Sequence, residues 1–344
     1  MSIFVSIAAY CDPWLGFTLR SAMERARYPD QLRFGVVDQS LPERRFSVPG
    51  DLPADQITLI NIDARSARGP CWARALAMSL YWGEDWFLQI DSHTLFEQDW
   101  DVSLIGKAEA CRAVSEHCVV SSYPQAFDII DGVGVPRAEP GVVLAHVVSE
   151  GGSFPPDWPA LPFKPIRVHG VGALPGFHVG AGCLFADGAY VERFPYDPYL
   201  YFQGEEQALA ARLFTHGWDI YHVIDLPLLH LYNTPGSVLA TGERPLHWTE
   251  DYDKARSRRW WVHQSRSQAR LAELLWGDDA SALGIFGLGT ERSLSDYAEF
   301  SGIDYQRREL APKAFEGPWK AWIETASVEP VVGDAPDRIS GDAQ

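Results

Sequence analysis

The hydrophobic pattern of the first hundred residues alternates between two kinds of segment. Short apolar runs at 3–9, 32–37, 57–62 and 86–90 end in polar or turn residues, as buried strands do. Between them, residues 14–27 and 71–82 have helical spacing, and Pro29, Pro70 and Gly83 mark helix boundaries. Strands that alternate with helices predict an α/β fold with a mostly parallel central sheet.

The rest of the chain has a less regular pattern. From 122 to 182 glycine and proline accumulate and periodicity fades, which predicts long loops over a site, with a disordered insertion as the alternative. Regular spacing returns at 182–186 and in a predicted helix at 205–216, followed by Gly217. We therefore predict a main domain at 1–250, a helical C-terminal extension at 251–325 and a mobile tail at 326–344.

Composition narrows the class of protein. The chain has 344 residues, 46% of them hydrophobic, so it can bury a sizeable core. With 46 acidic and 29 basic residues, its formal charge of −17 disfavours nucleic acids and anionic membranes as partners. The five cysteines are scattered, and the apolar run at 3–9 is too short for a signal peptide or a membrane span. These features predict a cytoplasmic protein.

The most informative short motif is Asp91-Ser92-His93, directly after the apolar run at 86–90. Ligands of open α/β sheets bind at the carboxyl ends of strands, and extended residues two apart point to the same side. A carboxylate and an imidazole together suit Mn²⁺, with Mg²⁺ as a second possibility. Such a triplet is often only a cap or a turn, but its place after a buried strand favours a metal site.

Several ordered motifs carry a more specific indication. They are RGPCWAR at 68–74, QIDSHTLF at 89–96, DWD at 99–101, GEE at 204–206, THGWD at 215–219, HLY at 230–232 and GLGTERSL at 287–294. With these motifs the chain resembles the N-acetylglucosaminyltransferases that modify hydroxyproline on Skp1-type proteins. That family is similar to the GT-A enzymes, so the resemblance implies a Rossmann-like GT-A sandwich with a C-terminal helical extension.

The resemblance also implies a metal centre. Asp91 and His93 match the family's metal-binding D-x-H motif, and His230 is the matching third ligand. The ion would bridge the two phosphates of a UDP-sugar donor and stabilise the departing nucleoside diphosphate. By itself, a histidine at the end of an apolar run such as 228–230 is more often a core or surface residue.

Further residues are candidates for donor binding. Arg68, Gly69 and Arg74 lie at the start of a predicted helix, where N–H and guanidinium groups can hold phosphate, although solvated arginines are an equal alternative. Asp12 and Gln39 end the first two strands and resemble the family's edge for the donor base. Ser92 lies between the two metal ligands and belongs to the same predicted donor site.

Two acidic residues and one basic cluster complete the candidates. In GT-A enzymes an acidic pair in the place of Glu205 and Glu206 borders the acceptor hydroxyl and the sugar, which makes both catalytic candidates. Glutamates in the first turn of a helix also gain from the helix dipole, so a structural role is the alternative. The arginines at 256, 258, 259 and 266 indicate a solvated helix face or a lid over the diphosphate.

These observations predict a metal-dependent glycosyltransferase. The resemblance implies transfer of N-acetylglucosamine from UDP-GlcNAc, with retention of configuration, to a hydroxyl of a protein or peptide, with a glycan as another possible acceptor. One alternative is a metal-dependent hydrolase that uses Asp91, His93 and His230, although the chain has no H-E-x-x-H motif. The other is a non-catalytic carbohydrate-binding module on the same fold.

Overall fold

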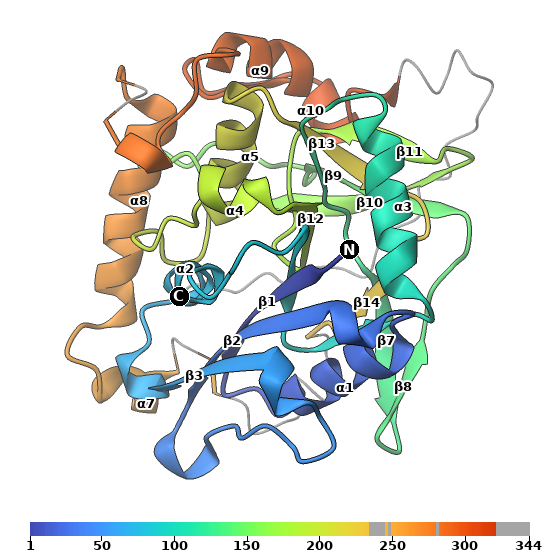
Figure 1. Ribbon diagram of the computed structural model, residues 1–344. Helices are drawn as coiled ribbons and strands as arrows, with labels where there is room; N and C mark the ends of the chain where they lie inside the picture. Colours follow the sequence, from blue (N-terminus) through green and yellow to red (C-terminus); the bar gives the residue numbers. More distant parts are fainter. Residues whose placement is uncertain (234–244, 247–248, 280–281, 321–344) are drawn as a thin grey trace.

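The computed structural model describes residues 1–233, 245–246, 249–279 and 282–320, and a large mixed sheet forms its centre (Figure 1). Eight strands follow the order β11-β13-β6-β12-β4-β1-β2-β3. Their bounds are β1 Ile3–Tyr10, β2 Leu32–Ser40, β3 Ile57–Asp63, β4 Trp86–Asp91, β6 Cys118–Val120, β11 Ala173–Gly176, β12 Cys183–Asp187 and β13 Asp219–Val223. Strands β3, β2, β1 and β4 are parallel, and β12 is antiparallel to β4 and β6. The predicted α/β fold is confirmed.

Helices cover both faces of this sheet. In β1, Ile3, Val5 and Ile7 lie in one apolar cluster with side chains of helices α1 (Leu15–Arg25) and α3 (Trp100–Arg112). Phe4 points the other way, into a second cluster that includes side chains of α2 (Pro70–Met78) and α5 (Glu205–Thr215). Because successive strand residues point to opposite faces, a strand covered on both sides needs the continuous apolar run that the sequence has.

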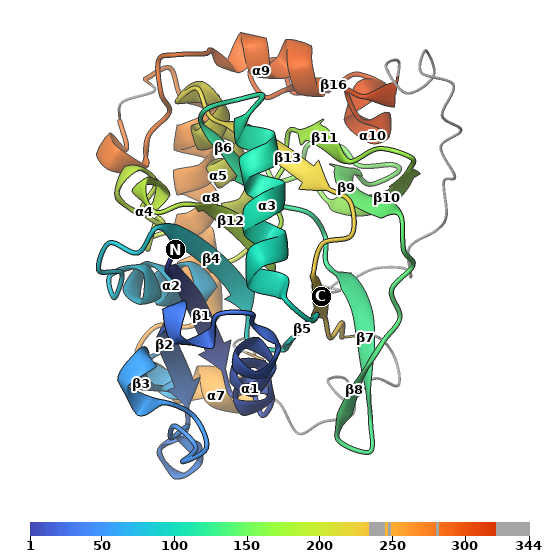
Figure 2. The ribbon, with the colours of Figure 1, turned by 45° about the vertical axis from the view of Figure 1, so that its right-hand side comes forward.

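A smaller sheet starts where β4 ends. It has the order β5-β14-β7-β8, with β5 at Thr94–Phe96, β14 at Leu228–His230, β7 at Gln125–Ile130 and β8 at Val133–Pro136. In the turned view, the β7-β8 hairpin extends away from the main sheet (Figure 2). His230 pairs with Thr94 across the β14-β5 ladder. This register brings the end of β14 beside the Asp91-Ser92-His93 segment.

The segment at 122–182 differs from its prediction. Instead of long loops it contains β7, β8 and β11, together with an antiparallel hairpin of β9 (Val142–Val148) and β10 (Phe163–His169). Every residue of β9 is buried, so β9 lies within the core. The prediction was wrong because it gave more weight to the glycine and proline residues between the strands than to apolar runs such as Val142–Val148, which form β9.

The C-terminal part is mainly helical. Its elements are α7 Glu250–Lys254, α8 Trp260–Trp276, η5 Gly284–Phe286, α9 Leu294–Ser301, β15 Ile303–Asp304, β16 Glu309–Leu310 and α10 Lys313–Glu316. Helix α8 runs along one side of the molecule, and α9 and α10 lie at one end of it (Figure 1). Leu271, Leu274 and Tyr297 join the same buried cluster as α5, so this part packs on the main sheet's domain. The predicted mobile tail at 326–344 lies outside the described residues.

The remaining elements are short. They are α4 Ala189–Arg193, η1 Pro29–Gln31, η2 Pro42–Arg44, η3 Ala54–Gln56 and η4 Ala64–Ser66. Within the part of the chain that the structure describes, no helix combines the length and the hydrophobicity that crossing a bilayer requires.

Candidate functional site

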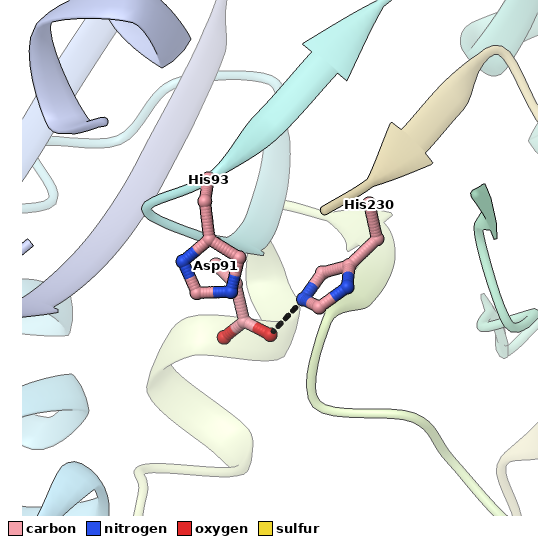
Figure 3. A group of neighbouring side chains, drawn as sticks. All are labelled: Asp91, His93 and His230. Carbon is pink, nitrogen blue, oxygen red and sulfur yellow. Dashed lines mark hydrogen bonds and ion pairs between the residues drawn. The ribbon is translucent and has the colours of Figure 1, made fainter. Parts of the chain in front are cut away.

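Three side chains meet at the junction of the two sheets. Asp91 ends β4, His93 lies just before β5, and His230 ends β14. One ligand atom from each lies within 4.8 Å of the other two, and the three side chains point toward one another (Figure 3). His230 Nε2 is 3.1 Å from Asp91 Oδ2, and the rings of His93 and His230 are 4.7 Å apart. Residues separated along the chain thus form one cluster.

The chemistry of this cluster fits a divalent ion. One carboxylate and two imidazoles are common ligands of Mn²⁺ and Zn²⁺. Burial alone would raise the pKa of Asp91, but the hydrogen bond with His230 and the charge of Arg74 hold that pKa well below its usual range, so the carboxylate is ionised. Gly182 borders the cluster, and a Cβ there would lie 3.2 Å from Asp91 Oδ2. The glycine keeps that side of the carboxylate uncrowded.

Arg74 connects the cluster to helix α5. Its guanidinium donates to Asp91 Oδ1 at 3.0 Å and to Glu205 Oε1 at 2.7 Å. Glu205 is 4% exposed, and its other oxygen accepts from Cys71 Sγ at 2.9 Å. Burial raises the pKa of Glu205, and the nearby guanidinium opposes that rise. Arg74 and Glu205 therefore form a buried support behind Asp91.

Asp12 supports the cluster from the other side. Its Oδ2 is 2.6 Å from His93 Nδ1 and accepts from Ser92 Oγ at 2.5 Å. The side chain of Asp12 has no exposed surface, and Ser92 is 2% exposed. Cys11, just before it, has φ +46°, a left-handed conformation that is uncommon outside glycine. The chain turns sharply there, after β1, where the carboxylate meets His93.

The other predicted donor residues lie along the same edge. Gln39, near the end of β2, donates from Nε2 to Ala9 O at 3.1 Å, and among the described residues its buried Oε1 has no hydrogen-bond partner. Arg68 is exposed and lies 5.2 Å above the ring of Trp72. Gly69 has φ +96°, and a Cβ there would lie 2.5 Å from Tyr201 O, so the start of α2 requires glycine.

Glu206 differs from its neighbour Glu205. Its Oε1 accepts from the N–H of Ala181 at 2.7 Å, and its Oε2 lies 3.7 Å from His178 Nε2. The side chain of Glu206 is 35% exposed, against 4% for that of Glu205. Glu206 is therefore the acidic residue of this pair that solvent reaches.

Comparison with known proteins gives the family. The sequence model of the family described as glycosyltransferase (GlcNAc) matches residues 42–307, well over half of the chain. The chain belongs to the GlcNAc glycosyltransferase family. This glycosyltransferase has no match among curated protein sequences.

Solved structures support the fold of this glycosyltransferase. A structure described as GalNAc-T7 with UDP, GalNAc and Mn²⁺ is similar with a TM-score of 0.52 and 14% sequence identity. The match covers 96% of this chain but 58% of that one, so the glycosyltransferase spans little more than half of GalNAc-T7. Residues 1–349 of TarS from S. aureus match at 13% identity over 83% of this chain and 80% of that one, and the TM-score of 0.38 adds no support. The GT-A fold is thus confirmed.

Sequence reasoning missed several residues of the glycosyltransferase's site. Ala181 connects its parts, because its N–H donates to Glu206 while its carbonyl accepts from Gln89 Nε2 at 3.0 Å. Tyr196 adds a contact of 3.2 Å to Arg74. The run of small residues at 180–182, directly before β12, was the available signal, since small residues there let Asp91 and the backbone approach each other.

Proposed function

We propose that this glycosyltransferase depends on a divalent metal and transfers N-acetylglucosamine from UDP-GlcNAc to a hydroxyl of a protein or peptide. The convergence of Asp91, His93 and His230 carries the proposal, because it joins the ends of two sheets in a ligand set suited to Mn²⁺. The UDP and Mn²⁺ bound in the similar GalNAc-T7 structure support a UDP-linked donor and this ion, and the family description supports N-acetylglucosamine as the sugar. The resemblance of the sequence motifs to enzymes that modify hydroxyproline supports a protein acceptor.

The ion would contribute charge stabilisation. Bound by Asp91, His93 and His230, it would neutralise negative charge that develops on the diphosphate as the sugar departs. Arg74 and Glu205 act behind Asp91, where they keep its carboxylate oriented. Ser92 and Asp12 act behind His93.

Arg68, Gly69 and Gln39 are the proposed donor contacts outside the metal cluster. Arg68 precedes the N-terminus of α2 and has no ion-pair partner among the described residues, so its guanidinium can bind phosphate. Gly69 allows the positive φ directly before α2 and the close packing against Tyr201, and so keeps Arg68 next to the N-terminus of that helix. Gln39 is the proposed contact for the nucleotide base, and its side chain would have to turn outward to make it, because its Oε1 is buried in this structure.

Glu206 is the proposed acceptor-side carboxylate. Its side chain is partly exposed and the N–H of Ala181 orients it, so it can position an acceptor hydroxyl or a sugar hydroxyl. A reaction with retention on one face of the sugar needs no side-chain base, since a donor phosphate oxygen can take the acceptor proton. For that reason we assign Glu206 a positioning contact with substrate and not proton abstraction.

A donor screen tests the proposal. Purified protein is incubated with UDP-GlcNAc, UDP-GalNAc or UDP-glucose and with peptides that carry hydroxyproline, serine or threonine, in Mn²⁺, Mg²⁺ or EDTA. We expect a mass increment of one N-acetylhexosamine with UDP-GlcNAc and Mn²⁺, and an α linkage by NMR. Transfer that is unchanged in EDTA would contradict the metal dependence, and a β linkage would contradict retention.

A pair of matched variants distinguishes the role of Glu205 from that of Glu206. Glu206→Gln removes the charge of a side chain proposed to position substrate but keeps its size, so we expect kcat to fall by about 10²-fold with an unchanged melting temperature. Glu205→Gln leaves Arg74 with a weaker buried partner, so we expect a loss of stability of about 1–3 kcal/mol. An equal loss of kcat in the two variants, with no change in stability, would contradict this division of roles.

A further inference from the structure

A buried carboxylate lies directly behind one of the proposed metal ligands. Asp12 Oδ2 is 2.6 Å from His93 Nδ1 and 2.5 Å from Ser92 Oγ, and Asp12 Oδ1 accepts from the N–H of Trp14 at 2.9 Å. Both oxygens are therefore engaged inside the protein. The side chain has no exposed surface through which a nucleotide could touch it.

We propose that Asp12 is a positioning residue that fixes the orientation and the tautomer of His93, and that it does not contact the donor base. An ionised carboxylate can only accept a hydrogen bond, so at 2.6 Å it selects the imidazole that carries its proton on Nδ1. The lone pair is then on Nε2, which lies on the side of Asp91 and His230 (Figure 3). The inference rests on the proposed function in that it takes this cluster as the metal site.

Ser92 completes the arrangement. It donates to the same oxygen that faces His93, while Trp14 holds the second oxygen, so the carboxylate cannot turn away without losing these bonds. Carboxylates that accept from a ligating histidine orient the ring and raise its basicity, and their loss typically weakens metal binding 10–100-fold. The bend at Cys11, with φ +46°, leads directly into this position.

A buried carboxylate one strand away provides a matched control. Asp38, on β2, is 1% exposed and accepts from the N–H of Phe46 at 2.9 Å and from Ser40 Oγ at 2.7 Å. It resembles Asp12 in burial and in its types of partner, and the charge of Asp12 acts on it, but it has no contact with His93. Substitution of Asp38 therefore reproduces the general cost of losing a buried carboxylate at this end of the sheet.

Manganese affinity is the first test, measured by electron paramagnetic resonance without donor. We expect Asp12→Ala to weaken Mn²⁺ binding about 10–100-fold. Asp12→Asn should weaken it by a similar factor, because the N–H of Trp14 keeps the amide oxygen and the amide NH2 then faces Nδ1 of His93. Asp38→Ala is expected to leave the affinity within about twofold of the wild type. Wild-type affinity in Asp12→Ala, or an equal loss in Asp38→Ala, would overturn the assignment.

The tautomer of His93 is the second test, and it needs neither metal nor activity. Two-bond nitrogen-15 NMR of the metal-free protein is expected to show a proton on Nδ1 of His93 in the wild type and on Nε2 in the folded Asp12→Asn variant. A proton on Nε2 in the wild type would overturn the proposal. Failure of the wild type to bind Mn²⁺ would instead contradict the metal dependence of the proposed function, whereas normal binding by Asp12→Ala contradicts the role of Asp12 alone.

Discussion

The molecule contains two groups of histidines with opposite surroundings. His93 and His230 face carboxylates, those of Asp12 and Asp91, at the edge of the sheet. A second group, His146, His178 and His222, lies in the interior, where the ring of His146 is 5.4 Å from that of His178 and 4.7 Å from that of His222.

The interior group is held by packing and by a contact of 2.5 Å between His222 Nδ1 and Ser121 O. The ring of His178 stacks 3.5 Å from that of Phe163, and no ring nitrogen of His146 or His178 has a hydrogen-bond partner among the described residues. Burial lowers the pKa of His222 to about 4 and that of His146 well below its ordinary value. The two groups differ in their partners. His93 and His230 each have a ring nitrogen within 3.1 Å of a carboxylate oxygen, whereas in the interior group His178 lies 3.7 Å from Glu206 Oε2 and burial keeps His146 and His222 neutral.

The largest expected effect tests the carboxylate at the centre of the metal site. Asp91→Asn removes the charged ligand and leaves Arg74 with a neutral partner, so we expect metal-dependent transfer to fall by about three orders of magnitude. Initial rates of UDP release measure this, with His222→Gln as the control from the interior group. If Asp91→Asn kept more than a tenth of the activity, the metal site would not hold the role proposed for it.

The next effect compares one histidine from each group. We expect His230→Ala to weaken Mn²⁺ binding about 10²-fold, because it removes a ligand from a set of three. His222→Gln should bind Mn²⁺ as the wild type does, since the interior ring does not belong to the cluster. Calorimetric titration measures the Mn²⁺ affinity of both variants. Similar losses of affinity in the two would contradict the difference between the two groups of histidines.

The pH dependence of the free energy of unfolding tests the interior group of histidines. The pKa of His222 is about 4 in the folded protein and about 6.5 when unfolded. Below pH 6.5 the His222 imidazole binds a proton in the unfolded chain, whereas in the folded protein it stays neutral until the pH is near 4. The stabilisation from a neutral His222 is therefore complete above pH 6.5 and is lost as the pH falls toward 4, at up to about 1.4 kcal/mol per pH unit.

Urea unfolding of the wild type and of His222→Gln between about pH 4.5 and about pH 8 measures this slope. Carboxylates also lose stability in acid, so the difference between the two proteins is the informative quantity. We expect a flatter curve for the variant. Parallel curves would show that the interior ring is not held neutral.

The smallest effect concerns the bend that leads to Asp12. Glycine accepts a positive φ without strain, so Cys11→Gly should keep wild-type Mn²⁺ affinity and change stability by less than about 1 kcal/mol. Cys11→Val places a β-branched residue in the left-handed region and should cost about 1–2 kcal/mol. Thermal unfolding of both variants compares them, and equal stability would mean that the strain at this bend is negligible.

Sequence reasoning predicted the strand ends well. A buried strand that stops at Asp91 locates the edge of the sheet, and period-two spacing puts His93 on the same side. His230 could be added only through the resemblance, because nothing local distinguishes it from a core histidine. The family match then confirmed the enzyme class, while the ion and the acceptor remain proposals.

The direction of a side chain was harder to predict than its position. Asp12 follows β1 as expected, but only the left-handed turn at Cys11 decides whether it points toward a nucleotide or under His93, and cysteine does not signal such a turn. Glu205 and Glu206 are adjacent on a helix and so point about 100° apart. Which of them is buried depends on Arg74, a contact 131 residues away in the chain.

The meeting of β4 and β14 also bears on how the chain folds. Asp91 and His230 are 139 residues apart in sequence, so bringing them together costs considerable loop-closure entropy. An ion held by both would act as a cross-link across that loop. At a metal concentration of a hundred times Kd it would add about 2.7 kcal/mol to the folded state. Metal supply would then govern the lifetime of the folded chain as well as its turnover.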